Sequence, residues 1–267
     1  MRMTRYALLR AALSAAVLCA TLGAGTHGLS DAHTAQPQEL TTYKLTGEEG
    51  MVEGVISVSG VVPPRPIIST MEADPVCASA NKGVMRAEDI VVERGRLANA
   101  LVYVESAALE GRKFEPHAWM PALGSRKCRM VPHVLAIQAG QLLYVQNNER
   151  TYHNPTFQTK VNPLYNKGLP PGETFQILFK QPEPPFVVRC NQHPWELGYI
   201  AVLPHPFFSV TGRNGAFAIE GLPPGDYEVV VWHEKFKEAR AKVSVGVKET
   251  KVSNFVFKFP EDQREGR

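Results

Sequence analysis

The chain has 267 residues, 44% of them hydrophobic, which is enough for one large or two modest domains with buried cores and excludes a disordered protein. The formal net charge of +3 is small, and the Lys and Arg residues are scattered without an aromatic-interleaved basic stripe, which argues against nucleic acid as a partner. Twenty-one Pro and twenty-one Gly interleaved with short Val, Ile and Phe runs favour strands and tight turns, so we expect an all-β fold.

Residues 1–25 have the layout of a secretory signal peptide. Arginines near the start precede a run from Ala11 to Leu22 that contains almost no polar residue. This run is short for a stable transmembrane helix, and no second run follows it. We therefore expect an exported protein, periplasmic or extracellular, with no integral membrane segment in the mature chain. Residues 26–50 are polar with little periodicity and are interpreted as a linker.

The next part of the chain is rich in strand patterns. Residues 52–60 alternate as a half-buried strand, and the prolines that follow end it because proline cannot donate to a β-ladder. Further strands are expected at 88–92, 98–104, 131–137, 142–147, 174–179, 186–189 and 199–203. The stretch around Cys77 and residues 105–127 are weakly patterned and are interpreted as irregular.

The pattern restarts after Pro206. Residues 207–211 and 216–219 flank a turn at 212–215, and its Asn-Gly pair is typical of a β-hairpin. Three more strands are expected at 227–232, 242–247 and 251–259. We expect a small second β-sandwich over 205–259 and a charged tail over 260–267.

Cys190 and His193 lie three residues apart in a short loop between two expected strands, and His153 follows an earlier strand. Strand ends on a rigid sheet fix the geometry of metal ligands. A thiolate with two imidazoles suits copper redox chemistry, because sulfur favours Cu(I) while imidazole accommodates both oxidation states. Zinc stays open as an alternative, since the same residues with Glu196 would form a closed tetrahedral site.

The cysteine count bears on this site. Without the leader the chain keeps Cys77, Cys128 and Cys190, an odd number in an oxidising compartment. If Cys190 binds a metal, Cys77 and Cys128 are free to form a disulfide and no stray thiol is left. The alternative is two unpaired, buried cysteines.

The residues around these ligands resemble the copper motifs of the cupredoxins, the blue-copper family of plastocyanin and azurin. The likeness is carried by residues 140–148, by Tyr152-His153-Asn154 and by Cys190-x-x-His193-x-Trp195. It implies a cupredoxin-like Greek-key β-sandwich over residues 51–204. It also implies that His153, Cys190 and His193 are the equatorial ligands of one mononuclear copper ion.

The second sandwich resembles another family. Residues 210–217 and 222–227 are similar to the carboxypeptidase regulatory-like domain, a transthyretin-like β-sandwich. That domain has no enzymatic role in its family. The resemblance implies a non-catalytic domain fused to the copper domain.

Glu196 departs from the cupredoxin pattern, in which Met usually stands here and supplies the weak axial ligand. Met120 and Met130, the nearest methionines, lie far back in the chain. A carboxylate is hard and anionic, so a bound Glu196 would stabilise Cu(II), lower the potential and move the site toward the red, nitrosocyanin-like type. Alternatively, Glu196 points to solvent and copper stays three-coordinate or takes a backbone carbonyl.

The sequence favours a non-enzymatic electron carrier whose redox partner, such as a cytochrome, docks near the exposed loop. An open-site copper protein that binds or converts a small molecule such as a nitrogen oxide is the second interpretation. A copper store or chaperone and a zinc-stapled adhesion module are further alternatives.

Other aromatic and imidazole side chains are given lesser roles. Trp195, beside a ligand, is expected to shield the metal or to form part of the electron path. His133 is interpreted as structural. His205 and the triplet at 232–234 are interpreted as surface or interdomain residues.

Overall fold

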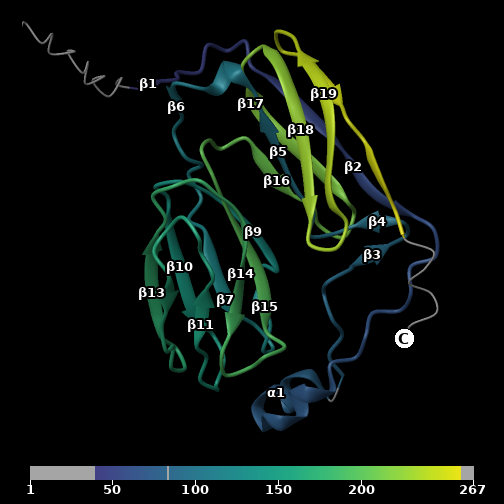
Figure 1. Ribbon diagram of the computed structural model, residues 1–267, viewed down its shortest axis with the longest axis vertical. Coiled ribbons are helices and arrows are strands. Elements are labelled where there is room, and N and C mark those ends of the chain that lie inside the picture. The colour runs from purple at the N-terminus through teal and green to yellow at the C-terminus, as the bar shows by residue number, and fades with distance from the viewer. Residues whose placement is uncertain (1–39, 83, 260–267) are drawn as a thin grey trace, which may run out of the picture. The chain divides into compact units, whose positions relative to one another are not determined.

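The computed structural model describes residues 40–82 and 84–259, which belong to one compact unit. The expected leader, most of the linker and the charged tail lie outside these residues. The described chain consists almost entirely of strands (Figure 1), so the all-β class is confirmed. Among these residues, no helix has both the length and the apolar character needed to cross a membrane.

The first sandwich packs a four-stranded sheet against a five-stranded sheet (Figure 1). The smaller sheet has the order β13 (Thr174–Leu178), β10 (Leu142–Asn147), β7 (Ala122–Ser125) and β8 (Met130–Val131). The larger sheet has the order β12 (Tyr165–Asn166), β11 (Pro155–Phe157), β14 (Glu183–Cys190), β15 (Leu197–Leu203) and β9 (Val134–Gln138). Leu143 and Ile177 from one sheet meet Val188 and Ile200 from the other in a common buried core.

The second sandwich is built around β2 (Gly50–Ser59) and β18 (Gly225–His233). One sheet has the order β16 (Phe208–Val210), β5 (Leu101–Glu105), β18 and β19 (Lys237–Val245). The other has the order β17 (Ala216–Leu222), β2, β4 (Arg96–Leu97) and β3 (Val92–Glu93), with β20 (Thr250–Val252) and β21 (Phe255–Lys258) also paired to β2. Two further strands, β1 (Thr41–Thr42) and β6 (Arg112–Lys113), pair with each other.

The expected division of the chain at residue 204 differs from the observed strand pairing. β2 and β5, expected in the copper domain 51–204, pair instead with β17, β20 and β21 and with β16 and β18. The second sandwich therefore takes strands from both sides of the first one in sequence, and not only from 205–259. The physical reason is that alternation fixes which face of a strand is buried but not which strand it pairs with.

The predicted hairpin across Asn214-Gly215 is wrong, although its turn forms. The N–H of Gly215 donates to the carbonyl of Gly212 at 2.9 Å, and Gly215 has a φ of 68°. A Cβ on Gly215 would lie 2.5 Å from the carbonyl oxygen of Ile56, so glycine is also required by close packing. Because β16 pairs with β5 while β17 pairs with β2, the turn carries the chain between the two sheets.

Three strands, β5, β9 and β15, are buried on both faces, which explains their nearly uninterrupted apolar sequences. In β15, Ile200 enters the core of the first sandwich, whereas Ala201 joins a cluster with side chains of β5 and β9. His133 adds a polar contact, with its Nε2 2.5 Å from Oε1 of Glu234. The two sandwiches therefore share a packed contact, and His133 has an acidic partner that its sequence neighbourhood does not show.

A short helical segment departs from the irregular structure expected around Cys77. It contains the 3-10 helix η1 (Ser69–Ala73) and the helix α1 (Pro75–Asn81); a second 3-10 helix, η2 (Ala107–Leu109), lies elsewhere. The Asp74 carboxylate caps α1, and Pro75 occupies its first turn, an Asp-Pro signal for a helix start that the sequence contained. Cys77 forms the expected disulfide with Cys128. We call residues 67–82 the cap segment.

Substitution of Gly54 tests the placement of β2. A Cβ there would lie 2.0 Å from the carbonyl oxygen of Ser253, so Gly54→Ala forces one backbone to move and is expected to lower the free energy of unfolding by ~2 kcal/mol or more. Gly225→Ala is the matched control, since its Cβ would meet no atom closer than 3.8 Å, and is expected to stay within ~0.5 kcal/mol of the wild type. Urea unfolding measures both, and equal stabilities would contradict this pairing of β2.

The buried imidazole of His205 makes folding sensitive to acid. Burial lowers its pKa from the ordinary 6.5 to about 4. As the pH falls from 6.5 toward about 4, His205 binds a proton in the unfolded state but not in the folded state. The free energy of unfolding therefore decreases toward low pH. His205→Phe, in a site already lined by Phe114 and Phe207, is expected to reduce the slope of unfolding free energy against pH by up to ~1.4 kcal/mol per pH unit. Urea titrations between pH 4 and 6.5 measure this slope, and an unchanged slope would contradict the neutral, buried state of His205.

Candidate metal centre

Four buried side chains, His153, Cys190, His193 and Glu196, bring their donor atoms within 4.8 Å of one another. The Sγ atom of Cys190 lies 3.8 Å from Nδ1 of His153 and 3.7 Å from Nδ1 of His193, and these two nitrogens are 3.1 Å apart. Oε2 of Glu196 lies 2.8 Å from Nδ1 of His153 and 3.8 Å from Nδ1 of His193. The structure thus brings together all four residues that the sequence singled out as metal ligands.

Strand ends hold two of these side chains. Cys190 is the last residue of β14 and pairs in register with Pro155 of β11. His153 lies just before β11 and exchanges two backbone hydrogen bonds with Leu169, at 3.1 and 2.8 Å. Backbone pairing thus holds Cys190 against β11 and His153 against Leu169. His153 and Cys190 therefore have little freedom to move apart.

The loop between β14 and β15 carries the other two ligands. The N–H of Glu196 donates to the carbonyl of His193 at 2.9 Å, and the N–H of Cys190 donates to the carbonyl of Glu196 at 3.1 Å. These bonds close the loop into a tight turn. Within this short turn, the side chains of Cys190, His193 and Glu196 therefore converge on the same place.

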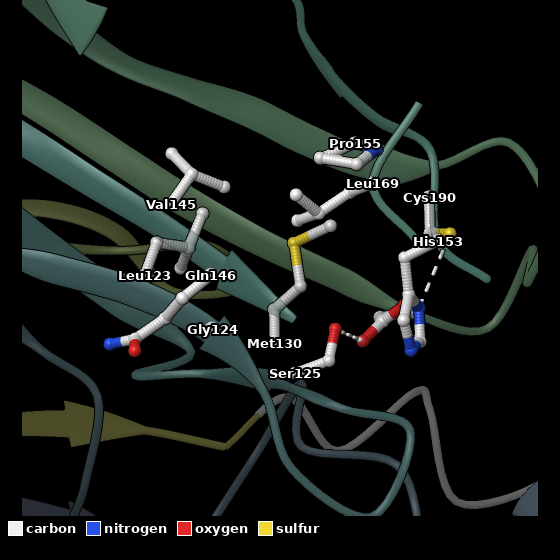
Figure 2. Close-up of a pocket in the computed structure, with 11 residues that line it drawn as sticks. Leu123, Gly124, Ser125, Met130, Val145, Gln146, His153, Pro155, Leu169 and Cys190 are labelled. Atoms are coloured by element: carbon white, nitrogen blue, oxygen red, sulfur yellow. Dashed lines mark hydrogen bonds and ion pairs between the residues drawn. The ribbon is translucent and has the colours of Figure 1, made fainter. Parts of the chain in front are cut away.

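Glu196 faces the interior. It is only 1% exposed, and its Oε1 accepts a 2.6 Å hydrogen bond from the hydroxyl of Ser125 on β7 (Figure 2). Its Oε2 faces the two imidazoles. The alternative in which Glu196 points to solvent is wrong, since a carboxylate at this position is enclosed by the two sheets.

The donor set fits a divalent metal ion. With metal–ligand bonds of about 2.0–2.3 Å, two ligands of a tetrahedral metal lie ~3.4 Å apart. The separations of 3.1, 3.7 and 3.8 Å among the sulfur and nitrogen donors bracket that value. The 2.8 Å contact between Glu196 and His153 is a hydrogen bond, which a metal bond would replace. Thiolate, imidazole and carboxylate together suit a divalent metal such as Cu(II) or Zn(II).

In the site, two acidic side chains, Cys190 and Glu196, lie beside two imidazoles. Burial acts to raise the pKa of Glu196, but hydrogen bonds with His153 and His193 outweigh burial and lower it to about 2. Burial also raises the pKa of the Cys190 thiol, which hydrogen bonds with the same imidazoles lower to about 7. Burial lowers the pKa of each imidazole, yet Cys190 and Glu196 raise it to about 9 for His153 and about 10 for His193. At neutral pH a divalent metal would therefore displace protons from the two imidazoles.

Three residues beside the ligands were missed in the sequence. Ser125 holds Glu196, and Oδ2 of Asp74 lies 3.0 Å from Nε2 of His193. Met130, only 4% exposed, lines the same small cavity as Cys190 (Figure 2), although it lies far back in the chain. No local motif marks these residues as neighbours of the site, because each comes from an element that tertiary packing brings there.

Trp195 covers one side of His193. The centroids of the two rings are 5.1 Å apart, and the indole N–H donates to the carbonyl of Cys128 at 3.2 Å. This arrangement supports the expected shielding of the site. A role in the electron path stays a prediction.

The other histidines singled out in the sequence lie apart from this group. His133, His205 and His233 are buried elsewhere, so a surface position of His205 and of residue 233 is wrong, while the alternative of an interdomain role stays a prediction. Within residues 40–82 and 84–259, one further group of possible ligands lies close together, namely Asp74, Cys77 and His193. Cys77 is held in the disulfide, which leaves the four-residue group as the candidate set of His, Cys, Asp and Glu donors in the described residues.

Comparisons with known proteins give similarity in shape only. No family model matches the chain, and no curated protein matches it. A purple cupredoxin from Nitrosopumilus maritimus is 20% identical, with 31% of this chain and 98% of that chain covered and a TM-score of 0.27. Amicyanin from Paracoccus versutus is 20% identical, with 38% and 96% covered and a TM-score of 0.29.

A third similar structure is a copper-containing nitrite reductase from Thermus scotoductus. It is 16% identical, with 56% of this chain and 28% of that chain covered and a TM-score of 0.30. Similarities this low assign neither a family nor a function to the chain. The expected carboxypeptidase regulatory-like domain stays a prediction, and the four side chains of the metal centre carry the functional assignment.

Proposed function

We propose that the chain is a copper protein that transfers electrons through one mononuclear site. His153, Cys190 and His193 would hold the metal equatorially, and Glu196 would take the axial position. The observation that carries the proposal is the convergence of the buried Cys190 sulfur, two Nδ1 atoms and one carboxylate oxygen within 4.8 Å.

The chain's own residues suit rapid electron transfer. Copper, when bound, supplies the one-electron redox couple. The ligands lie at strand ends and in a closed loop, so their positions change little when the charge of the metal changes. Each of the four ligands is at most 2% exposed, which excludes water from the donor atoms.

Glu196 sets the charge of the site. A thiolate and a carboxylate together neutralise Cu(II), whereas Cu(I) would leave one net negative charge among buried groups. An uncompensated buried charge is costly, so this donor set favours Cu(II). A site with a neutral thioether in place of Glu196 would be balanced by Cu(I). We therefore expect a low reduction potential and a spectrum of the red rather than the blue type.

The closed donor set favours a carrier over the alternatives. A protein that converts a small molecule needs an exchangeable position on the metal, while here four protein donors face the centre. A store or chaperone has to release its metal readily, which fully buried ligands oppose. Zinc is distinguished by metal analysis of the natural protein.

The partner and the compartment are parts of the same proposal. A redox protein such as a cytochrome would dock over the exposed residues of the ligand loop, Asn191, Gln192 and Pro194. Export to the periplasm or cell exterior is supported by the Cys77–Cys128 disulfide, since such bonds persist in oxidising compartments.

Copper reconstitution tests the proposal directly. One equivalent of Cu(II) is expected to give a visible band from charge transfer between Cys190 and copper, an electron paramagnetic resonance signal, and reversible bleaching on one-electron reduction. Cys190→Ser is expected to abolish the band, because a hydroxyl does not replace the thiolate. His117→Ala, at an exposed histidine outside the site, is the control and should keep it. A wild-type chain that binds copper without this band would contradict the proposal.

Glu196→Gln tests the carboxylate. The amide keeps the size of the side chain but removes its charge, so the reduction potential is expected to rise by ~60 mV or more, equivalent to tenfold in the ratio of Cu(I) to Cu(II) affinity. The visible spectrum should shift toward the blue type. Glu173→Gln, at an exposed carboxylate of the same sandwich, is the control. Voltammetry and visible spectra that are identical in wild type and Glu196→Gln would exclude Glu196 as a ligand.

A further inference from the structure

The outer edge of His193 is covered by a part of the chain far from it in sequence. Its side chain is 2% exposed, and while Nδ1 faces Cys190, Nε2 lies 3.0 Å from Oδ2 of Asp74. Asp74 belongs to the cap segment and not to either sandwich sheet. Each nitrogen atom of the His193 imidazole thus has a neighbouring polar group, Cys190 at Nδ1 and Asp74 at Nε2.

Asp74 has other partners that fix its orientation. Its Oδ1 accepts the backbone N–H groups of Val76 at 2.8 Å and Cys77 at 3.1 Å, which caps α1. Its Oδ2 accepts the hydroxyl of Thr151 at 2.9 Å in addition to facing His193. The direction in which the carboxylate points is therefore set by the two backbone bonds at the helix start, before any contribution from His193, and the bond from Thr151 is an additional contact.

The cap segment is tied to the ligand loop. The disulfide joins Cys77 of α1 to Cys128, and the carbonyl of Cys128 accepts the indole N–H of Trp195. The side-chain amide of Asn81 donates to the carbonyls of Cys77 at 2.9 Å and Lys127 at 3.0 Å. Because Trp195 lies between two ligands, the covalent tether and the metal loop form one continuous set of contacts.

This arrangement matters chemically for the tautomer of His193. An imidazole that offers the lone pair of Nδ1 to a metal carries its proton on Nε2. A carboxylate that accepts this N–H fixes both the tautomer and the rotation of the ring, and it makes the ring a better donor.

We propose that Asp74 is a positioning residue of the metal centre, held by the disulfide-tethered cap against Nε2 of His193 so that Nδ1 stays directed at the metal. The residue does not touch the metal itself. The identity of the metal rests on the proposed function, whereas the contact between Asp74 and His193 does not require a metal to be bound.

Two variants separate this role from helix capping. In Asp74→Asn the side-chain oxygen still caps α1, since Asn is as good a cap as Asp, but an amide NH2 replaces the oxygen that accepts from His193. In Asp74→Ser the cap is also kept, while the side chain is too short to reach the imidazole. Thr151→Val is the matched control, because it removes the other hydrogen bond to Oδ2 and leaves the carboxylate beside His193.

Copper transfer to excess chelator is the first measurement. Asp74→Asn and Asp74→Ser are expected to release copper ~10–100-fold faster than the wild type, with altered electron paramagnetic resonance parameters, whereas Thr151→Val stays within about threefold. Unfolding midpoints in urea, compared without metal, confirm that the variants are folded. A wild-type release rate and an unchanged spectrum in Asp74→Asn would overturn the inference.

Proton NMR of the copper-free protein is the second measurement. The wild type and Thr151→Val are expected to show a slowly exchanging, downfield Nε2–H resonance from His193 that both Asp74 variants lack. Its absence from the wild type would overturn the inference whatever metal the protein carries. A wild type without a copper–thiolate spectrum would count against the proposed function alone, and the NMR comparison would then decide the role of Asp74.

Discussion

The metal centre depends on the pairing of β14 with its two neighbours. Cys190 stands opposite Pro155 in β11, and Arg189 stands opposite Leu197 in β15. Along β14 the side chains of Val188 and Cys190 point inward in alternation, so core packing and thiolate position share one register. A slip of one residue would turn Cys190 to the opposite face of the sheet and remove the sulfur from the site. The rest of the site is arranged around this constraint.

The second constraint is charge. Two acidic and two basic side chains are removed from water within a few ångströms, which is unfavourable unless each has a partner. Ser125 satisfies the free oxygen of Glu196, and Asp74 faces the outer nitrogen of His193. Nε2 of His153 is the exception, since no hydrogen-bond partner accompanies it in the described chain. Residues beyond the ligands thus satisfy two of these buried groups, while the ligands themselves are the main charge partners of one another.

The cap segment covers one part of the metal site, whereas another part of the ligand loop stays exposed. It covers the edge of His193, while Asn191 and Gln192 at the other side of the loop are exposed. Under the proposed function, a redox partner meets the loop backbone beside Cys190 and not the imidazole edge. The same cover is expected to slow metal exchange, which suits a carrier that keeps its copper. The packed contact between the two sandwiches involves the other face of β15, at Ala201 and Leu203.

The sequence by itself determined the all-β class, most strand positions and the four candidate ligands, because alternation and the Cys190–Glu196 spacing are local properties. It did not determine which strands pair: β2 and β5 joined the second sandwich, and β16 and β17 separated into different sheets. Nor did it show that Glu196 is buried or that Asp74, Ser125 and Met130 lie beside the ligands. Those contacts join residues distant in sequence, and only tertiary packing, which buries one face of each strand against a particular neighbour, decides them.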